Sequence, residues 1–336
     1  MKTPGTMLAA AAALLIVSCG RSERTSAPAA AAKTSSPTAA TAVNAAVYMC
    51  PMDRDVRGYG PGKCPRCGMA LVTSIPDPVE YLVDVTTAAA PQPGVPVQLN
   101  FGITDPWKGN PVTRFMEVHE RLYHAFVVSR DLQFFVHGHP EWRNNRFEYT
   151  VTFPKPGMYR VLSDFYPEAS VPQLSASTLF VGDVEPNPRP IVLAKDYAPK
   201  QGENVGVSMV SIPEAAIAGM PTRLRFALDQ ATGFEKYLGV WAHMLIASDD
   251  LIDMMHTHPS IANGGPEVEF TVVFPRPRTY RLWIQLQRNG TVNTVHFDVP
   301  VKAMPDEGAT VRGFDGSMVP FPRSGPIGAG GWKVHG

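Results

Sequence analysis

An internal repeat is the feature that most constrains how this chain can fold. Residues 123–140, YHAFVVSRDLQFFVHGHP, align without a gap with residues 242–259, AHMLIASDDLIDMMHTHP, and the match keeps three histidines, a serine, an Asp-Leu pair and a proline. FPKPGMYR at 153–160 also matches FPRPRTYR at 274–281 after a two-residue insertion, and GVPVQLNFGITD at 94–105 matches GMPTRLRFALDQ at 219–230. Such self-similarity indicates a duplicated domain. We therefore expect two related domains, at residues 80–184 and 204–302.

Each repeat is predicted to be a β-sandwich. Its apolar runs are short, rich in β-branched and aromatic residues, and bounded by Pro, Gly, Asn or Asp. Six or seven strands at this spacing are typical of an immunoglobulin-like sandwich, so the fold class is mainly β. Tyr159 and Tyr280 are expected to be corner or core residues, and the Gly- and Pro-rich residues 303–336 to be an irregular tail. In the first repeat we expect strands at 97–103, 122–129, 133–136, 147–153, 157–163 and 177–181.

The N-terminal segment has the features of an export signal. An apolar stretch from Met7 to Val17 is too short to span a bilayer and is followed by Ser18 and Cys19. This ending resembles the lipobox of bacterial lipoproteins, which implies a signal peptide over residues 1–18 and lipidation of Cys19. An ordinary secretory signal is the alternative. Gly20 then points to the periplasmic face of the outer membrane, and residues 19–46, mostly Ala, Ser, Thr and Pro, are predicted to be a disordered linker.

Six of the nine histidines occupy equivalent positions in the two repeats. If 122–129 and 133–139 form a hairpin, residues whose numbers sum to 261 pair with one another, and His124 lies opposite His137. His139 shares their face because alternate residues of a strand point the same way. The same arithmetic pairs His243 with His256 at a sum of 499. The sequence therefore predicts two convergent trios: His124, His137 and His139 in the first repeat, and His243, His256 and His258 in the second.

Each predicted trio suits Cu(II), Zn or another borderline divalent ion, with a coordination position left open. A hydrogen-bonded structural trio is the alternative, and a loop of odd length would separate the histidines by shifting the register. Met254 shares the face of His256 and would favour a softer ion, whereas methionines 244 and 255 are expected to fill the core. Asp131 and Asp250 are expected to form turns. His119, whose counterpart is Leu238, is expected to be incidental.

Residues 48–72, YMCPMDRDVRGYGPGKCPRCGMALV, contain three of the chain's four cysteines. Cys64 and Cys67 form a Cys-x2-Cys knuckle, a spacing that lets two thiolates hold one ion, and Cys50 adds a third thiolate. The sequence leaves three possibilities open: a structural zinc with an oxygen ligand, a thiolate and thioether site for a soft monovalent ion, and a disulfide with one free thiol. The remaining candidate ligands nearby are Asp53, Met49, Met52 and Met69.

This cysteine segment resembles the short heavy-metal-binding domain found at the termini of copper-transporting P-type ATPases and in periplasmic adaptors of metal efflux pumps. That family has Tyr-x-Cys-Pro-Met-His-Pro and then Pro-Gly-x-Cys-Pro-x-Cys-Gly-Met-x-Leu, and the chain departs from it at Asp53 and Arg54, where the family usually has His-Pro. The resemblance implies that residues 47–76 bind a heavy metal, with a bias toward copper or silver. So small a segment would need the ion for its stability. The two repeats resemble uncharacterised secreted domains that accompany this module, which assigns them no activity.

We therefore expect an extracytoplasmic lipoprotein of the bacterial cell envelope that binds copper or zinc for sequestration, resistance or delivery. The alternatives are a zinc-stapled protein that docks to an envelope or efflux partner, and a copper-dependent redox enzyme. With 30 basic and 30 acidic residues, no net field would attract nucleic acid. The sequence has no nucleophile elbow, paired-carboxylate motif or phosphate loop, so no enzyme is expected. The expected partners are the metal ion and, through Cys19, the membrane. The expected ligands of the small module are Cys50, Cys64 and Cys67, helped by Asp53, Met52 and Met69.

Overall fold

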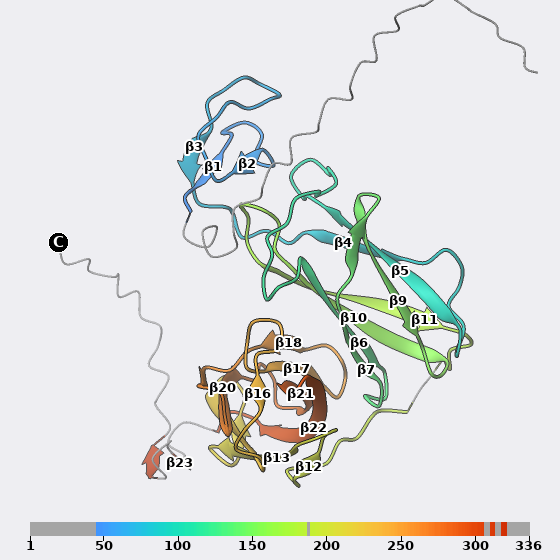
Figure 1. Ribbon diagram of the computed structural model, residues 1–336, viewed down its shortest axis with the longest axis vertical. Coiled ribbons are helices and arrows are strands. Elements are labelled where there is room, and N and C mark those ends of the chain that lie inside the picture. Colours follow the sequence, from blue (N-terminus) through green and yellow to red (C-terminus); the bar gives the residue numbers. More distant parts are fainter. Residues whose placement is uncertain (1–44, 187–188, 306–309, 313–316, 321–336) are drawn as a thin grey trace, which may run out of the picture. The chain divides into compact units, whose positions relative to one another are not determined.

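The structure is a computed structural model that describes residues 45–186, 189–305, 310–312 and 317–320 (Figure 1). These residues form strands, turns and loops, and none of them belongs to a helix long and apolar enough to span a bilayer. The predicted signal peptide, the lipidation site Cys19 and nearly all of the predicted linker lie outside the described residues.

The first repeat is a sandwich of two antiparallel sheets with strand orders β4-β5-β9-β8 and β11-β10-β6-β7 (Figure 1). This is the ABED and GFC order of an immunoglobulin-like sandwich, with β7 as an added C′ strand, and it confirms the predicted fold class. All six predicted strands are present, and the short strands β4 and β8 complete the first sheet. The bounds are β4 Leu82–Thr86, β5 Pro96–Thr104, β6 Tyr123–Ser129, β7 Phe135–Gly138, β8 Glu141–Arg143, β9 Arg146–Thr152, β10 Gly157–Phe165 and β11 Gln173–Val181.

The second repeat has the same layout with extra short strands. Its sheets have the orders β12-β13-β15-β20-β19 and β14-β22-β21-β17-β18, and β16 also pairs with β21. β14 joins β22 in parallel, whereas the other pairs are antiparallel. The bounds are β12 Lys200–Gln201, β13 Gly206–Ile212, β14 Ala216–Ile217, β15 Pro221–Leu228, β16 Phe234–Glu235, β17 His243–Ser248, β18 Met254–Thr257, β19 Ile261–Ala262, β20 Glu267–Val273, β21 Thr279–Arg288 and β22 Thr291–Lys302.

The cysteine segment forms a three-stranded sheet of its own, ordered β2-β1-β3. Its strands are β1 Val47–Met49, β2 Arg57–Gly58 and β3 Val72–Ser74. A buried ion pair of 2.5 Å between Arg57 and Asp105 joins this module to the first repeat. In the tail that we expected to be irregular, β23 Thr310–Arg312 pairs with β24 Met318–Pro320, so a short hairpin ladder is present there.

The central strands of the two repeats are buried on both faces. In β6, Tyr123 and Val127 belong to the core of the first sandwich, while Phe126 and Val128 belong to a separate apolar cluster shared with the second repeat. β17 divides in the same way, since Met244 packs in the second core and Leu245 and Ala247 in the shared cluster. Burial on both faces explains why these strands are almost continuously apolar in sequence.

Two sequence predictions about local structure are confirmed. The hydroxyl of Tyr159 donates to the carbonyl of Lys155 at 2.7 Å, and that of Tyr280 donates to the carbonyl of Arg276 at 3.1 Å, which is the hydrogen bond of a tyrosine corner. The Asp131 carboxylate accepts hydrogen bonds from the Ser129 hydroxyl at 2.5 Å and from a backbone amide at 3.2 Å, as expected of a turn former. Asp250 does the same in the second repeat, at 2.6 and 3.2 Å.

The predicted hairpin register is wrong by two residues. His137 pairs with Phe126, and His256 pairs with Leu245, so the paired numbers sum to 263 and 501 instead of 261 and 499. The cause is the turn: the Ser129 amide donates to the carbonyl of Phe134 at 3.1 Å, which leaves four loop residues centred one position later than we assumed. Because the shift is an even number of residues, the histidines still share one face.

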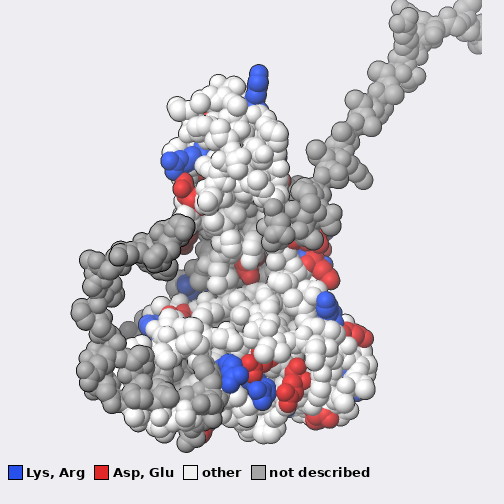
Figure 2. Space-filling model, turned by 90° about the vertical axis from the view of Figure 1, so that its left-hand side faces the viewer, with Lys and Arg blue, Asp and Glu red and all other residues white. Residues whose placement is uncertain are grey.

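Basic and acidic side chains are mixed on the surface. The face drawn in Figure 2 shows basic and acidic side chains interspersed, with no large area of one sign.

The buried guanidinium of Arg281 holds the Asp298 carboxylate through two hydrogen bonds of 2.7 Å and also donates to the carbonyl of Leu132 in the first repeat at 2.9 Å.

We predict that Arg281→Met lowers the free energy of unfolding by about 3–5 kcal/mol, because it leaves the Asp298 carboxylate buried without its partner. Urea denaturation measures this change. The double variant Arg281→Met, Asp298→Leu should recover most of the loss. Arg143→Met, which breaks an exposed pair with Glu141, is the matched control and should change stability by less than about 1 kcal/mol. A small effect of the first variant would contradict the prediction.

Candidate metal centres

The cysteine module brings its three predicted thiols together with one carboxylate. Cys50, Asp53, Cys64 and Cys67 each offer a donor atom, and the four atoms lie within 4.8 Å of one another. Cys50 follows β1, while Cys64 and Cys67 lie in a tight turn closed by a hydrogen bond from the Gly68 amide to the carbonyl of Cys64 at 2.9 Å. Gly68 has a φ of 74°, a conformation that favours glycine. The three thiols are free, so the disulfide that the sequence left open is not formed in this structure.

Asp53 stands where the related family usually has histidine, and its two carboxylate oxygens have different partners. Oδ2 lies 3.3 Å from the sulfur of Cys64 and 3.9 Å from that of Cys50. Oδ1 forms ion pairs with Lys108 and Arg66. The hydrogen bond from Lys108 is the main reason that the pKa of Asp53 is lowered to about 2. The carboxylate is therefore ionised and presents one oxygen to the thiols, which matches the oxygen-ligand option for a metal site.

The Cys50 and Cys67 thiols have pKa values shifted in opposite directions, and their protons must leave when a metal ion binds. Burial raises the pKa of Cys50, but hydrogen bonds from the backbone amides of Asp53 and Met52 outweigh it and lower that pKa. The Met69 backbone amide lowers the pKa of Cys67, but burial and the neighbouring thiols outweigh it and raise that pKa to about 11. Metal binding at such a site displaces protons, so its affinity rises with pH.

The predicted methionine ligands, Met52 and Met69, are more exposed than most of the clustered donors. The side chains of Met52 and Met69 are 63% and 43% exposed, while Cys50, Cys64 and Asp53 are nearly inaccessible to solvent. A tetrahedral ion needs four ligands, and the three thiols and the Asp53 carboxylate supply that number.

The first histidine trio converges as predicted. Donor nitrogens of His124, His137 and His139 lie within 4.8 Å of one another. The Nδ1 of His124 is 3.1 Å from the Nε2 of His137, and the buried Nε2 of His139 has no hydrogen-bond partner. The second trio repeats this geometry: the Nδ1 of His243 is 3.2 Å from the Nε2 of His256 and 3.1 Å from the Nε2 of His258.

The outer hydrogen bonds of the first trio show that its facing nitrogens carry lone pairs. The Nε2 of His124 is 3.1 Å from the carbonyl oxygen of Val118, and the Nδ1 of His137 is 2.7 Å from the Oε1 of Gln285. Each of these outer nitrogens must donate, because an oxygen acceptor faces it. In a neutral imidazole the other nitrogen then has no proton, so the pair at 3.1 Å is two acceptors rather than a hydrogen bond.

The second trio is held in the same way. The Nε2 of His243 donates to the carbonyl of Tyr237 at 3.0 Å, and the Nδ1 of His256 donates to the carboxylate of Asp164 at 2.6 Å. Lone pairs that converge at about 3 Å fit a shared cation with metal–nitrogen bonds of about 2.0–2.1 Å. The 3.1 Å contact between the Nε2 of His258 and the Nδ1 of His243 also fits a hydrogen bond, so the structural alternative stays open for this pair.

The structure also places His119, which we expected to be incidental, beside the second trio. Its ring centroid lies 4.0 Å from that of His258 and 5.8 Å from that of His243. The signal for its position was absent from the repeat, because Leu238 occupies the equivalent place. Met254, which we considered as a soft ligand, packs instead in the apolar cluster shared by the repeats.

Burial keeps five of the six trio histidines neutral. It is the main cause that lowers the pKa of His124 and His139 to about 4 and that of His243 and His258 to about 2. Burial also holds the pKa of His137 well below its usual value. Neutral imidazole is the form that binds metal, so protons compete weakly with an ion at this site.

We predict that the metal-free protein loses stability as pH falls from about 6.5 to about 4. In this range the unfolded chain, whose histidines have a pKa of about 6.5, binds more protons than the folded chain, so acid favours unfolding. The free energy of unfolding, measured by urea denaturation at each pH, should fall accordingly, by on the order of several kcal/mol for the whole cluster. His139→Gln should flatten the slope. Equal slopes in the two proteins would contradict the assignment.

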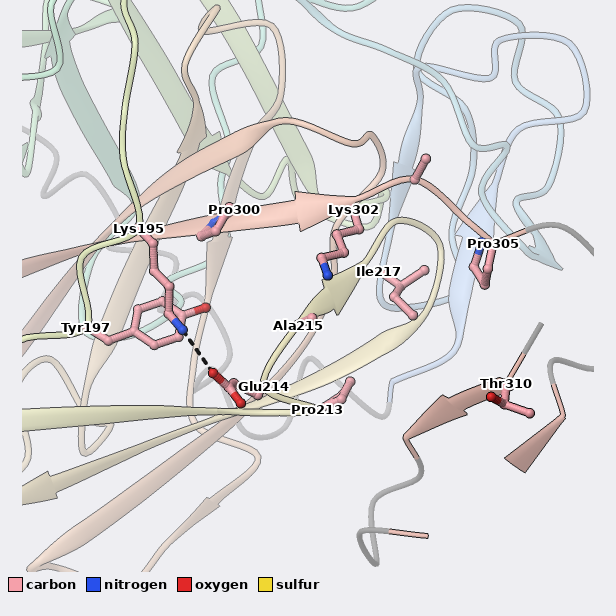
Figure 3. Close-up of a pocket in the computed structure, with 11 residues that line it drawn as sticks. Lys195, Tyr197, Pro213, Glu214, Ala215, Ile217, Pro300, Lys302, Pro305 and Thr310 are labelled. Carbon is pink, nitrogen blue, oxygen red and sulfur yellow. Dashed lines mark hydrogen bonds and ion pairs between the residues drawn. The ribbon is translucent and has the colours of Figure 1, made fainter. Parts of the chain in front are cut away.

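A cavity of about 520 Å³ is lined by residues of the second repeat and of the segments that flank it, and these donors are not part of its lining (Figure 3). The Lys195 ammonium forms a 3.1 Å ion pair with Glu214 beside it and lies 4.5 Å from the ring centroid of Tyr197. Figure 3 shows apolar residues such as Ile217 and Pro300 around this pair. The lining contains no histidine or cysteine, so it offers no metal site of the kind described above.

Comparisons with known proteins match two family profiles to the chain. A family profile described as Heavy metal binding domain matches residues 47–73, and one described as Domain of unknown function (DUF8832) matches residues 78–179 and 203–303. A comparison with curated proteins found no match.

Two solved structures are similar to the chain at low identity. The crystal structure of chicken CNTN1 FN1-FN3 domains is 8% identical over 72% of this chain and 76% of that chain, with a TM-score of 0.20. Escherichia coli alpha-2-macroglobulin activated by porcine elastase is 10% identical over 67% of this chain and 24% of that chain, with a TM-score of 0.23. The two DUF8832 matches span more than half of the sequence; the chain belongs to this family and carries a heavy metal binding domain ahead of its two repeats.

Proposed function

We propose that this protein is a lipid-anchored, extracytoplasmic protein of the bacterial envelope that captures a heavy-metal ion, copper first and zinc second, for sequestration, resistance or delivery. The observation that carries the proposal is the cluster of Cys50, Cys64, Cys67 and Asp53 inside the heavy metal binding domain. Thiolates are soft ligands that select Cu(I) and zinc over harder ions. The lipid anchor at Cys19 and the envelope location follow from the lipobox-like sequence.

A capture role without catalysis fits the small module. Two of its thiols are buried and Cys67 is exposed, so an ion can reach the site from solvent on the side of Cys67. The ionised Asp53 adds a negative charge next to the thiolates and a hard oxygen that zinc also accepts. Lys108, which belongs to the first repeat, holds this carboxylate in place and so ties the metal site to the sandwich.

A second candidate is a zinc-stapled module whose task is to dock the repeats to an envelope or efflux partner. The observation that favours it is the fastening of the module to the first repeat through Arg57 and Asp105 and through Asn110, whose amide donates to the Asp55 carboxylate at 2.8 Å. A structural zinc site closed by four protein ligands would stabilise such a unit.

We predict that the soluble variant Cys19→Ser retains Cu(I) at the cysteine module, and that Cys64→Ser abolishes this binding. Asp53→Asn should weaken it by about 10- to 100-fold, because the neutral amide is a poorer ligand. Metal content by mass spectrometry and competition with a Cu(I) chelator measure both effects. Met52→Leu is the matched control and should bind as the parent does.

The two candidate functions give different outcomes in the same measurement. Preference for Cu(I) over zinc supports capture of copper. One tightly held zinc that Cu(I) does not displace supports the docking module. A protein that takes up neither ion at the cysteines would overturn both candidates for this module.

A further inference from the structure

The two histidine trios lie against each other. Ring centroids of His137 and His243, one from each trio, are 5.4 Å apart, and those of His124 and His256 are 5.9 Å apart. Within a trio the corresponding distances are hardly shorter, for example 5.3 Å between His124 and His137 and 5.5 Å between His243 and His256. The six side chains therefore form one continuous cluster of imidazoles between the repeats.

The nitrogens nevertheless separate into two donor sets. The close approaches of 3.1–3.2 Å between histidine nitrogens all occur inside a trio. Two ligands of one tetrahedral ion with bonds of about 2.0–2.1 Å stand about 3.4 Å apart, so each trio fits its own ion. The geometry thus calls for two neighbouring ions rather than one shared ion.

Each trio is oriented by a residue of the opposite repeat. The side chain of Gln285, on β21 of the second repeat, accepts the hydrogen bond from His137 of the first repeat at 2.7 Å. Asp164, on β10 of the first repeat, accepts the one from His256 of the second at 2.6 Å. Asp164 and Gln285 are equivalent residues, because each lies five positions after the corner tyrosine of its repeat. The two repeats therefore exchange supporting residues reciprocally.

From these contacts we propose that the two trios form a single dinuclear metal centre between the repeats, which holds two late first-row divalent ions such as Cu(II) or Zn(II) and which neither repeat can complete alone. This inference rests on the proposed function, metal capture, and adds a second kind of site to it. Three imidazoles leave at least one coordination position open on each ion, where water or a small anion can bind.

The exchange of supporting residues is unequal, and this makes the two ions unequal. Asp164 is a carboxylate, which raises the basicity of the imidazole that it contacts, whereas Gln285 is a neutral amide. Loss of such a supporting residue typically weakens metal binding 10- to 100-fold. The site of His243, His256 and His258 should therefore fill first. His119 adds a seventh imidazole nearer to this site, with its ring centroid 4.0 Å from that of His258 and 6.3 Å from that of His124.

The test isolates the histidines in a full-length chain that carries Cys19→Ser together with Cys50→Ser, Cys64→Ser and Cys67→Ser. We expect this protein to bind two Cu(II) ions. Electron paramagnetic resonance should show an ordinary mononuclear signal after one equivalent. After two equivalents, spin–spin coupling between neighbouring ions should broaden or remove that signal.

Asp164→Asn should weaken the first binding step 10- to 100-fold, although Asp164 is not in the repeat that supplies the ligands of that step. Asp84→Asn, an exposed position in the other sheet of the first repeat, is the matched control and should have no effect. Gln285→Glu should tighten the second step. This gain keeps the test decisive even where Asp164→Asn impairs folding.

Two uncoupled mononuclear spectra, or affinities unchanged in both Asp164→Asn and Gln285→Glu, would overturn the dinuclear centre. Those outcomes leave capture by the cysteines intact, since that site is measured separately in a chain with its cysteines present and His137→Ala, His256→Ala in place. Conversely, two coupled ions in a protein whose cysteine module takes no metal would support the centre while the proposed function at the module fails.

Discussion

Phe126, Leu162 and Trp283 belong to one apolar cluster. It is built from the sheet that contains β6 and β10 in the first repeat and the sheet that contains β17 and β21 in the second. The ring of Phe135 stacks on that of Trp283 at 5.2 Å across this interface. Because β6 and β17 each supply residues to it, every alternate side chain of these strands must face the other repeat. The histidines at the start of β6 and β17 and along the paired strands β7 and β18 continue that same face. Packing between the repeats therefore decides where the imidazoles lie, and the proposed metal binding by the histidines depends on it.

The arrangement explains how so many imidazoles can be buried. A buried imidazole without a hydrogen-bond partner is costly. Here the outer nitrogens of His124 and His243 use backbone carbonyls, and those of His137 and His256 use the side chains of Gln285 and Asp164, so that their inner nitrogens are available to the proposed metal ions. The cysteine module is arranged in a similar way. Lys108 binds the Oδ1 of Asp53, and the Oδ2 of the same carboxylate faces the thiols.

Much of this could be predicted from the sequence, because local patterns carry it. Alternation of apolar residues and the repeat gave the strands, and the period of two placed each trio on one face even though the register was wrong. The error came from the turn, where the side chain of Asp131 fixes a later loop than the spacing alone implies. Asp53 was a candidate ligand only because it is near the cysteines in sequence. Its ion pair with Lys108 joins residues 55 positions apart, and no local sequence pattern indicates such a contact.

The contacts between the repeats could not be read from the sequence for a physical reason. Comparison of the two repeats shows which residues they share, but it does not show which of the shared positions face the other repeat. Asp164 and Gln285 differ in charge, so sequence comparison of the repeats marks them as a mismatch rather than as a pair with one role. His119 and Leu238 are a second mismatch of this kind, which gives no sign in the sequence that His119 lies beside the histidine cluster. Differences between equivalent residues are where a duplicated domain can make two neighbouring sites unequal, and here those differences surround the histidines.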